Sequence, residues 1–161
     1  MTHRVLITGS RDWTDRHAVG LALQSELEKH GEILILNGMC ERGADLHAHE
    51  YYLMHGSKWV REKEFPADWS RDCTSSCYHK PRYRNGERYC PLAGHLRNQA
   101  MVDFGADVCL AFPLEDSRGT YDCMKRAKKA GITVHNLGWG GERCLPALQY
   151  HSTPHRGCIL R

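Results

Sequence analysis

The stretch Arg4-Val5-Leu6-Ile7-Thr8-Gly9-Ser10-Arg11 decides the fold class of this chain. Its run of apolar and β-branched residues predicts a buried strand, and the glycine and serine that follow predict a loop. A helix is expected next, with Thr14 as its N-cap and Gly31 as its stop. Between these two residues, apolar side chains recur at helical spacing, at Val19, Leu23 and Leu27.

The same alternation of strand, loop and helix continues along the chain. Apolar runs predict further strands, and periodic segments predict further helices. Because parallel strands need crossovers and the crossover helices cover the sheet, the pattern predicts an α/β fold with a doubly wound parallel sheet and helices on both faces. The expected strands are residues 33–36, 59–64, 108–112 and 133–135, and the expected helices are residues 44–55, 94–104 and 119–130.

Composition sets broad limits on function. The chain has 161 residues, which suits one domain, and its 22 basic and 19 acidic residues leave a formal charge of +3. This balance argues against a general DNA coat. The apolar runs are far shorter than the roughly 18 residues that a membrane span needs. Met1 is followed almost at once by the first strand, so we expect no signal peptide, a cytoplasmic location and reduced cysteines.

Two segments depart from the alternation. Residues 66–92 lack periodicity and are rich in Asp, Ser, Cys, Arg and Tyr, so they predict an irregular insertion into the domain formed by residues 1–137. Residues 138–161 are rich in glycine and proline and predict an irregular tail that lies over the domain or reaches a neighbouring subunit. A homo-oligomer is the assembly that this tail favours.

Four loops at the carboxyl ends of the expected strands combine glycines and hydroxyls with arginines. In an open α/β sheet this edge binds ligands, and helix N-termini there suit anions. The alternative interpretation is that each loop holds only helix caps and turns, but a cap does not require a guanidinium. Neither a P-loop nor a G-x-G-x-x-G motif is present. The residues predicted to bind the ligand are Gly9, Ser10, Arg11, Gly38, Gly43, Asp45, Arg97, Asn98, Ser117, Arg118, Gly119 and Thr120.

Two tryptophans lie near these loops in the sequence. Trp13 follows the first loop and Trp69 lies in the insertion. Either indole offers a surface on which a base could stack, and ordinary packing is the alternative.

The order of these loop motifs resembles the SLOG superfamily, most closely its YspA/YpsA-related branch found in bacteria and phages. The resemblance rests on residues 5–12, 43–45, 97–98 and 117–120 and spans residues 4 to about 136. It implies a Rossmann-like fold that binds a nucleotide or a nucleotide-derived molecule. The superfamily includes sensors, enzymes and a DNA-processing branch, so the fold alone does not choose among them.

Within that superfamily, the stretch His95-Leu-Arg-Asn-Gln-Ala-Met101 and the later Gly119-Thr120 turn are similar to the LOG phosphoribohydrolases. This resemblance implies that Arg97 takes the position of a catalytic arginine and that the turn binds phosphate. The chain departs from the enzyme pattern at Asn98, where those enzymes have a lysine. Asp122 and Cys123 stand where they have two carboxylates, so Asp122 would be the one catalytic carboxylate left.

A cluster of potential metal ligands lies in the insertion. Cys73, Cys77, His79 and Cys90 supply three thiolates and one imidazole in the spacing C-x3-C-x-H-x10-C, which predicts a structural zinc site. An insertion with so little apolar content gains order from such a site. The alternatives are incidental cysteines, or His95 or a water in place of His79 as the fourth ligand.

The insertion also carries a basic and aromatic strip made up of Lys80, Arg82, Tyr83, Arg84, Arg88 and Tyr89. Such a strip suits a phosphate backbone and stacked bases, a lid over the pocket, or a solvated face. The sequence therefore predicts a protein that senses or sequesters a nucleotide-derived small molecule, with no membrane partner. A nucleoside 5′-monophosphate phosphoribohydrolase and a nucleic-acid-binding module are the alternatives.

Overall fold

The fold is taken from a computed structural model, which describes residues 1–138. Residues 139–161, which make up nearly all of the expected tail, lie outside the described residues. The first β-α unit is strand β1 (His3–Gly9) followed by helix α1 (Arg16–His30). The other elements of the domain are β2 (Ile33–Asn37), α2 (Ala44–His55), β3 (Val60–Glu64), α3 (Ala93–Phe104), β6 (Val108–Phe112), α4 (Arg118–Lys129) and β7 (Thr133–Asn136).

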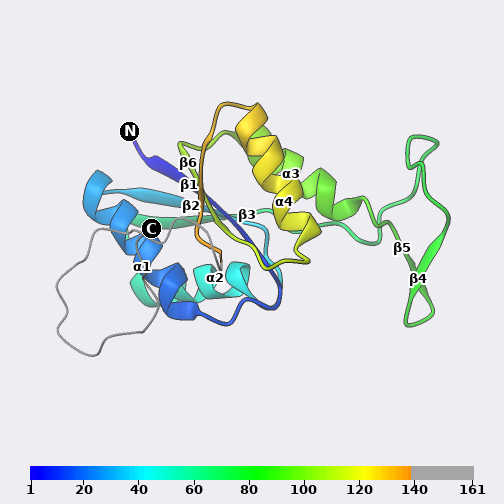
Figure 1. The fold of residues 1–161 in the computed structure, drawn as a ribbon, viewed down its shortest axis with the longest axis horizontal. Helices are drawn as coiled ribbons and strands as arrows, with labels where there is room; N and C mark the ends of the chain where they lie inside the picture. Colours follow the sequence, from blue (N-terminus) through cyan, green and yellow to red (C-terminus); the bar gives the residue numbers. More distant parts are fainter. Residues whose placement is uncertain (139–161) are drawn as a thin grey trace, which may run out of the picture.

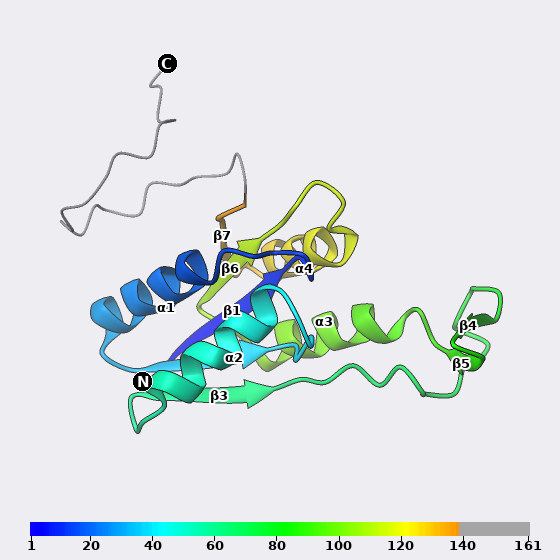
Figure 2. The same cartoon turned by 90° about the horizontal axis from the view of Figure 1, so that it is seen from below.

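The five strands of this domain form one sheet in the order β3-β2-β1-β6-β7, and every neighbouring pair is parallel. Helices α1 and α2 cover one face and α3 and α4 cover the other (Figures 1 and 2). The chain starts in the middle of the sheet at β1 and winds outward in both directions. The predicted doubly wound, Rossmann-like α/β fold is confirmed.

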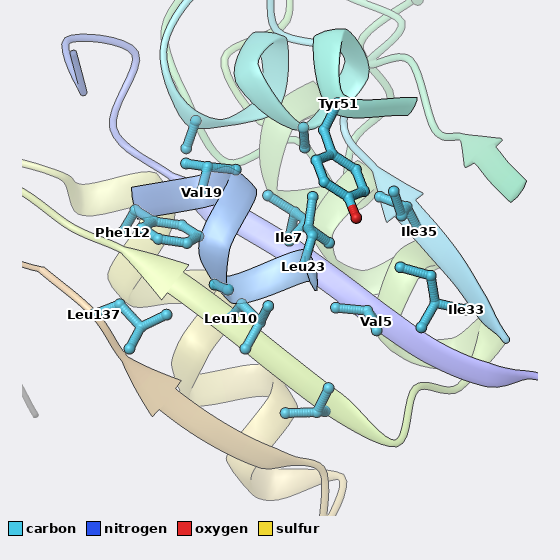
Figure 3. Packing of buried hydrophobic residues seen from close by; sticks show 14 of the residues in the cluster. Val5, Ile7, Val19, Leu23, Ile33, Ile35, Tyr51, Leu110, Phe112 and Leu137 are labelled. Carbon is cyan, nitrogen blue, oxygen red and sulfur yellow. The ribbon is translucent and has the colours of Figure 1, made fainter. Parts of the chain in front are cut away.

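Alternation along β1 divides the core between the two faces. Val5 and Ile7 point toward α1 and α2, where they pack with Val19, Leu23 and Tyr51 (Figure 3). Leu6 points the other way, toward side chains of α3 and α4, which include Met101, Cys123 and Ala127. All three strand residues are at most 1% exposed, as expected of a central strand covered on both faces.

One predicted helix boundary is corrected by the structure. Asp15 is the N-cap of α1, not Thr14, because the Asp15 carboxylate accepts a hydrogen bond of 2.9 Å from the backbone N–H of Ala18. A carboxylate here also faces the positive end of the helix dipole, an advantage that a threonine lacks. Gly31 ends the helix as predicted.

The insertion is more regular than its sequence predicts. It contains a two-stranded antiparallel hairpin, β4 (Arg82–Arg84) and β5 (Glu87–Tyr89), which projects beyond the N-terminal end of α3 (Figures 1 and 2). Asn85 and Gly86 form the turn with φ of 51° and 80°. Two positive φ values are what a type I′ hairpin requires, and Asn-Gly is its strongest sequence signal.

Within residues 1–138, no helix has both the length and the apolar character to cross a membrane.

Candidate functional site

A cleft of about 330 Å³ opens at the carboxyl ends of the central strands, and we call it the ligand cleft. The loops after β1, β2 and β6 and the first turns of α3 and α4 form its walls. Of the twelve predicted binding residues, eleven line it: Gly9, Ser10, Arg11, Gly38, Asp45, Arg97, Asn98, Ser117, Arg118, Gly119 and Thr120. The sequence patterns missed several other lining residues, among them Asp12, Cys40, Pro91, Met101 and Asp116.

Gly43, the last of the twelve predicted binding residues, does not line the cleft but packs against the β1 loop that does. Its φ is +78°, and a Cβ atom there would overlap the carbonyl oxygen of Ser10 and the Cα of Arg11. A Cβ on Gly9 would likewise overlap the side chain of Ala44. Two glycines thus let the β1 loop pack directly against the start of α2, and the Ser10 carbonyl accepts a hydrogen bond of 3.2 Å from the Ala44 N–H.

Arg97 lies in the floor of the cleft and is held by protein groups. Its Nη1 donates to the carbonyl of Gly38 and lies 3.6 Å from Oδ2 of Asp45, while its Nε donates to Oδ1 of Asn98 at 3.1 Å. The Arg97 and Asp45 side chains are 12% and 6% exposed. Burial raises the pKa of Asp45, and the Arg97 charge acts in the opposite direction. Two of the residues predicted to bind the ligand therefore form an ion pair with each other.

Asp122 lies at the edge of the site and does not line the cleft. Its Oδ2 accepts hydrogen bonds from Arg126 Nε at 2.8 Å and Asn98 Nδ2 at 3.2 Å, and it lies 3.0 Å from Nδ1 of His95. Burial alone would raise the pKa of Asp122, but these three partners outweigh it and lower the pKa. Asp122 is therefore an ionised group that fixes His95, which does line the cleft.

The first turn of α4 forms one end of the cleft. Ser117, Arg118, Gly119 and Thr120 begin this helix, and the first amide N–H groups of a helix have no acceptor within it. Asn98 ties the turn to α3, because its Nδ2 also donates to the Gly119 carbonyl at 3.0 Å. The N–H groups of Ser117 and Arg118 donate to the carbonyls of Leu114 and Asp116 at 3.0 and 2.8 Å, so the amides of Gly119 and Thr120 are the ones that face a ligand. N–H groups at the positive end of a helix suit a phosphate or carboxylate.

Trp69 also lines the cleft, and it is the one of the two predicted tryptophans that is available to a ligand. The guanidinium of Arg11 lies 5.5 Å from the centre of the Trp69 ring, and Gly94 packs closely against its edge. Trp13 is 3% exposed and packs on Phe112 in the core. Trp13 is therefore an ordinary core residue, whereas Trp69 is a residue of the insertion that forms part of the cleft wall.

The insertion brings the four predicted metal ligands together into a cysteine cluster consisting of Cys73, Cys77, His79 and Cys90. One ligand atom from each lies within 4.8 Å of all the others. The Sγ atoms of Cys77 and Cys90 are 4.0 Å apart, and His79 Nε2 is 3.6 Å from Cys73 Sγ and 3.7 Å from Cys90 Sγ. Tetrahedral zinc with bonds of about 2.3 Å to sulfur and 2.0–2.1 Å to nitrogen requires ligand separations of about 3.5–3.8 Å. The cluster can hold a metal ion.

Hydrogen bonds around the cluster orient His79 and lower the pKa values of Cys77 and Cys90. The hydrogen bond to the Lys80 carbonyl raises the pKa of His79, and burial raises the pKa of Cys73. His79 Nδ1 lies 2.8 Å from the Lys80 carbonyl, which leaves Nε2 facing the sulfurs, and Arg71 donates to both Cys77 and Cys90. Burial alone would raise the pKa of Cys90, but hydrogen bonds from His79, the Leu92 backbone and Arg71 lower it to about 6. His95 is engaged by Asp122 instead, so the geometry favours His79 as the fourth ligand.

The parallel sheet, the glycine-bounded loops and the cleft at its carboxyl edge define a Rossmann-like protein of the SLOG class. The chain belongs to the YspA, cpYpsA-related SLOG family, whose model matches residues 3–71. The gene 61 protein of Mycobacterium phage D29 is 42% identical to it over 138 residues, which cover 84% of this chain and 96% of the phage protein.

Two solved structures are similar to this chain. DNA processing protein A (DprA) from Streptococcus pneumoniae matches with a TM-score of 0.60 and 18% identity, and the match covers 84% of this chain but only 50% of that protein. The Moco carrier protein from Chlamydomonas reinhardtii matches with a TM-score of 0.49 and 17% identity, over 86% of this chain and 78% of that one.

Proposed function

We propose that the ligand cleft binds a phosphorylated, nucleotide-type small molecule, so that the protein acts as a sensor or sequestering protein. The observation that carries this proposal is the pairing of an anion-binding helix start with an aromatic wall in one cleft. Gly119 and Thr120 supply amides, Ser117 and Thr120 supply hydroxyls, and Trp69 supplies a stacking surface. A cleft of about 330 Å³ lies at the small end of the usual range for ligand sites.

Different residues of the cleft lining would contact the phosphate, the base and the sugar of the ligand. Phosphate would bind at residues 117–120 with help from the exposed guanidinium of Arg118, and the base would stack on Trp69 beside Arg11. The exposed carboxylates of Asp12 and Asp116 offer acceptors for sugar hydroxyls. Arg97 and Asp45 would act mainly as the charged floor that fixes the β2 loop, because each already has the other as its partner.

The test is a thermal-shift screen of the purified protein against nucleoside mono-, di- and cyclic phosphates and NAD derivatives, with the ligand then recovered by chromatography. A ligand that stabilises the fold and returns intact supports a sensor. Arg118→Ala should weaken its binding about tenfold, since a charge-assisted hydrogen bond contributes on that order. Lys125→Ala, an exposed cation farther along the same helix, is the control. An absence of any shift across the panel contradicts the proposal.

Hydrolysis of a nucleoside 5′-monophosphate is the second candidate function, and the pairing of His95 with Asp122 favours it. A carboxylate that holds Nδ1 of a histidine leaves Nε2 to exchange protons with a substrate. Arg97 would help to bind the phosphorylated sugar. Release of free base from a nucleotide supports this function, and a rate unchanged by Asp122→Ala contradicts the role of this pair.

Nucleic-acid binding through the hairpin is the third candidate function, and the exposure of the hairpin side chains favours this function. Arg82, Tyr83 and Arg88 are all exposed on a projection that Figures 1 and 2 show outside the domain. A basic, aromatic surface of this kind binds phosphates and stacks on bases. Steep loss of DNA or RNA affinity with rising salt supports it, and affinity that does not change with salt contradicts it.

The metal that we propose for the cysteine cluster is structural zinc. Three sulfurs and one imidazole at tetrahedral separations fit a closed site that leaves no position open for a substrate. When bound, zinc would supply the free energy that orders the insertion. Elemental analysis of protein made without a histidine tag should find one zinc per chain, and protein without zinc contradicts the assignment.

A further inference from the structure

A second hollow adjoins the ligand cleft, on the side of the β2 loop and the hairpin. Its volume is about 550 Å³, larger than that of the cleft itself. Arg11, Trp69 and Arg97 line both spaces, so the two are continuous around the Trp69 side chain. The second hollow also receives Arg84 from the hairpin and Arg42 from the loop before α2, neither of which lines the ligand cleft.

The second hollow is basic. Arg11, Arg42 and Arg84 all contribute exposed guanidinium groups, while Glu41 is the one carboxylate among its lining residues. Within residues 1–138 the ion pairs include neither Arg11 nor Arg84, and Arg42 has only a solvent-exposed pair with Asp12 at 3.5 Å. Guanidinium groups that converge on a hollow without matched carboxylates favour an oxyanion that accepts bidentate hydrogen bonds, such as phosphate.

The hairpin is oriented to bring Arg84 to this hollow. The guanidinium of Arg84 stacks over the ring of Tyr89 at 5.2 Å, and Tyr89 in turn packs edge-on against Trp69 with ring centres 6.5 Å apart. Trp69 is fixed from behind as well, because its carbonyl accepts a hydrogen bond of 2.9 Å from the Cys90 N–H. A chain of ring contacts therefore connects the hairpin cation to the wall that separates the two spaces.

We propose that the second hollow is a second phosphate subsite, so that the ligand carries two separated phosphate groups with an aromatic base against Trp69. This inference rests on the proposed function, since the first phosphate is the one assigned to residues 117–120. The ligand class is then a dinucleotide or the 5′-phosphorylated end of a single strand, which present the same base between two phosphates. A single mononucleotide fills only the ligand cleft.

Calorimetric titration with AMP and with the 5′-phosphorylated dinucleotide pApA tests the inference. The dinucleotide should bind about tenfold more tightly than AMP, as expected for one further charge-assisted contact. Arg84→Ala should remove most of that gain and leave AMP affinity unchanged. Arg82→Ala is the matched control, because it removes the same charge from the same strand at a residue that does not line the hollow.

The outcomes separate this inference from the proposed function. AMP and pApA binding with equal affinity, or equal losses in the Arg82 and Arg84 variants, overturns the second subsite and leaves the ligand cleft intact. Failure of both ligands to bind contradicts the nucleotide cleft and the second subsite together. A 5′-phosphorylated octanucleotide that binds as tightly as pApA supports the strand end as the source, and its exclusion supports a free dinucleotide.

Discussion

Nη1 of Arg97 lies 3.6 Å from Oδ2 of Asp45, and the two side chains are 12% and 6% exposed. The resemblance to phosphoribohydrolases assigns Arg97 to catalysis, and loop position makes Asp45 a predicted binding residue, so the sequence predicts two separate ligand contacts. In the structure Arg97 on α3 and Asp45 on α2 meet next to Gly38. A Cβ atom on Gly38 would overlap the Arg97 guanidinium. The floor of the cleft is thus a buried ion pair that fixes the loop after β2.

A double-mutant cycle on this pair should show strong coupling. Arg97→Met and Asp45→Asn should each destabilise the fold by about 3 kcal/mol, because each leaves a buried group without its partner. The loss of stability in the double variant should be smaller than the sum of the losses in the two single variants, by at least about 1 kcal/mol. Chemical denaturation measures all four proteins.

The control for this cycle is the pair formed by Arg42 and Asp12, which are 3.5 Å apart but 67% and 71% exposed. Solvent screens such a pair, so Arg42→Met and Asp12→Asn should combine additively. Additive losses in the Arg97 and Asp45 variants would contradict the structural role of the buried pair.

Asp122→Asn should change how stability depends on pH. The hydrogen bonds to Asp122 lower its pKa below the ordinary value of 3.8, so ionised Asp122 stabilises the fold above that value and the contribution is lost as the pH falls through the lowered pKa. At pH 7 the variant should be about 1 kcal/mol less stable than the unaltered protein.

The difference between the two proteins should shrink as the pH is lowered below 3.8. Urea denaturation at a series of pH values from about 2.5 to 7, which includes the range in which Asp titrates, measures this change. Glu115→Gln, an exposed carboxylate in the loop before α4, controls for net charge. A constant difference at every pH would show that the Asp122 hydrogen bonds do not depend on its charge.

Gly43→Ala should destabilise the protein more than Gly131→Ala. Both glycines have a φ of +78°, so both substitutions carry a backbone cost of about 1–3 kcal/mol, and the ψ of −149° at Gly43 lies in a region that essentially only glycine adopts. A Cβ on Gly43 also overlaps the β1 loop, whereas nothing lies within 4 Å of one on Gly131. Thermal denaturation compares the two variants, and equal losses would mean that the close approach of the β1 loop to α2 is not required.

Removal of metal should loosen the insertion and spare the sheet. The cluster residues lie in residues 66–92, whereas the hydrophobic clusters are formed by the sheet and its helices. With a chelator, amide hydrogen exchange should rise in β4 and β5 and change little in β1 and β6. Cys77→Ser should reproduce this effect and Cys40→Ser, which changes a cysteine outside the cluster, should not. Unchanged exchange in the hairpin would contradict a structural metal.

Local sequence signals predicted most of the fold because they coincide with tertiary structure. Helix α2 and strand β6 match their expected bounds, since Gly43 and Gly56 flank the helix and a continuous apolar run marks the strand. The hairpin was missed although Asn85-Gly86 signals its turn, because β4 and β5 are exposed and lack an apolar pattern.

The site was less predictable than the fold, because its geometry depends on contacts between distant residues. Glycines and arginines after the strands indicated which loops meet at the cleft. They could not indicate that Arg97 would reach back to Gly38, 59 positions away, or that Asp122 would orient His95. Asp116 belongs to none of the sequence motifs, so only the assembled cleft identifies it.

The most direct test of the nucleotide cleft is calorimetric titration of the best-stabilising nucleotide from the thermal-shift panel into the unaltered protein and the Arg118→Ala and Trp69→Ala variants. Both substitutions alter the cleft wall, at its phosphate and base ends, so each should weaken binding about tenfold and the Lys125→Ala control should not. Affinity that is the same in all four proteins would contradict the assignment of this cleft as the nucleotide site.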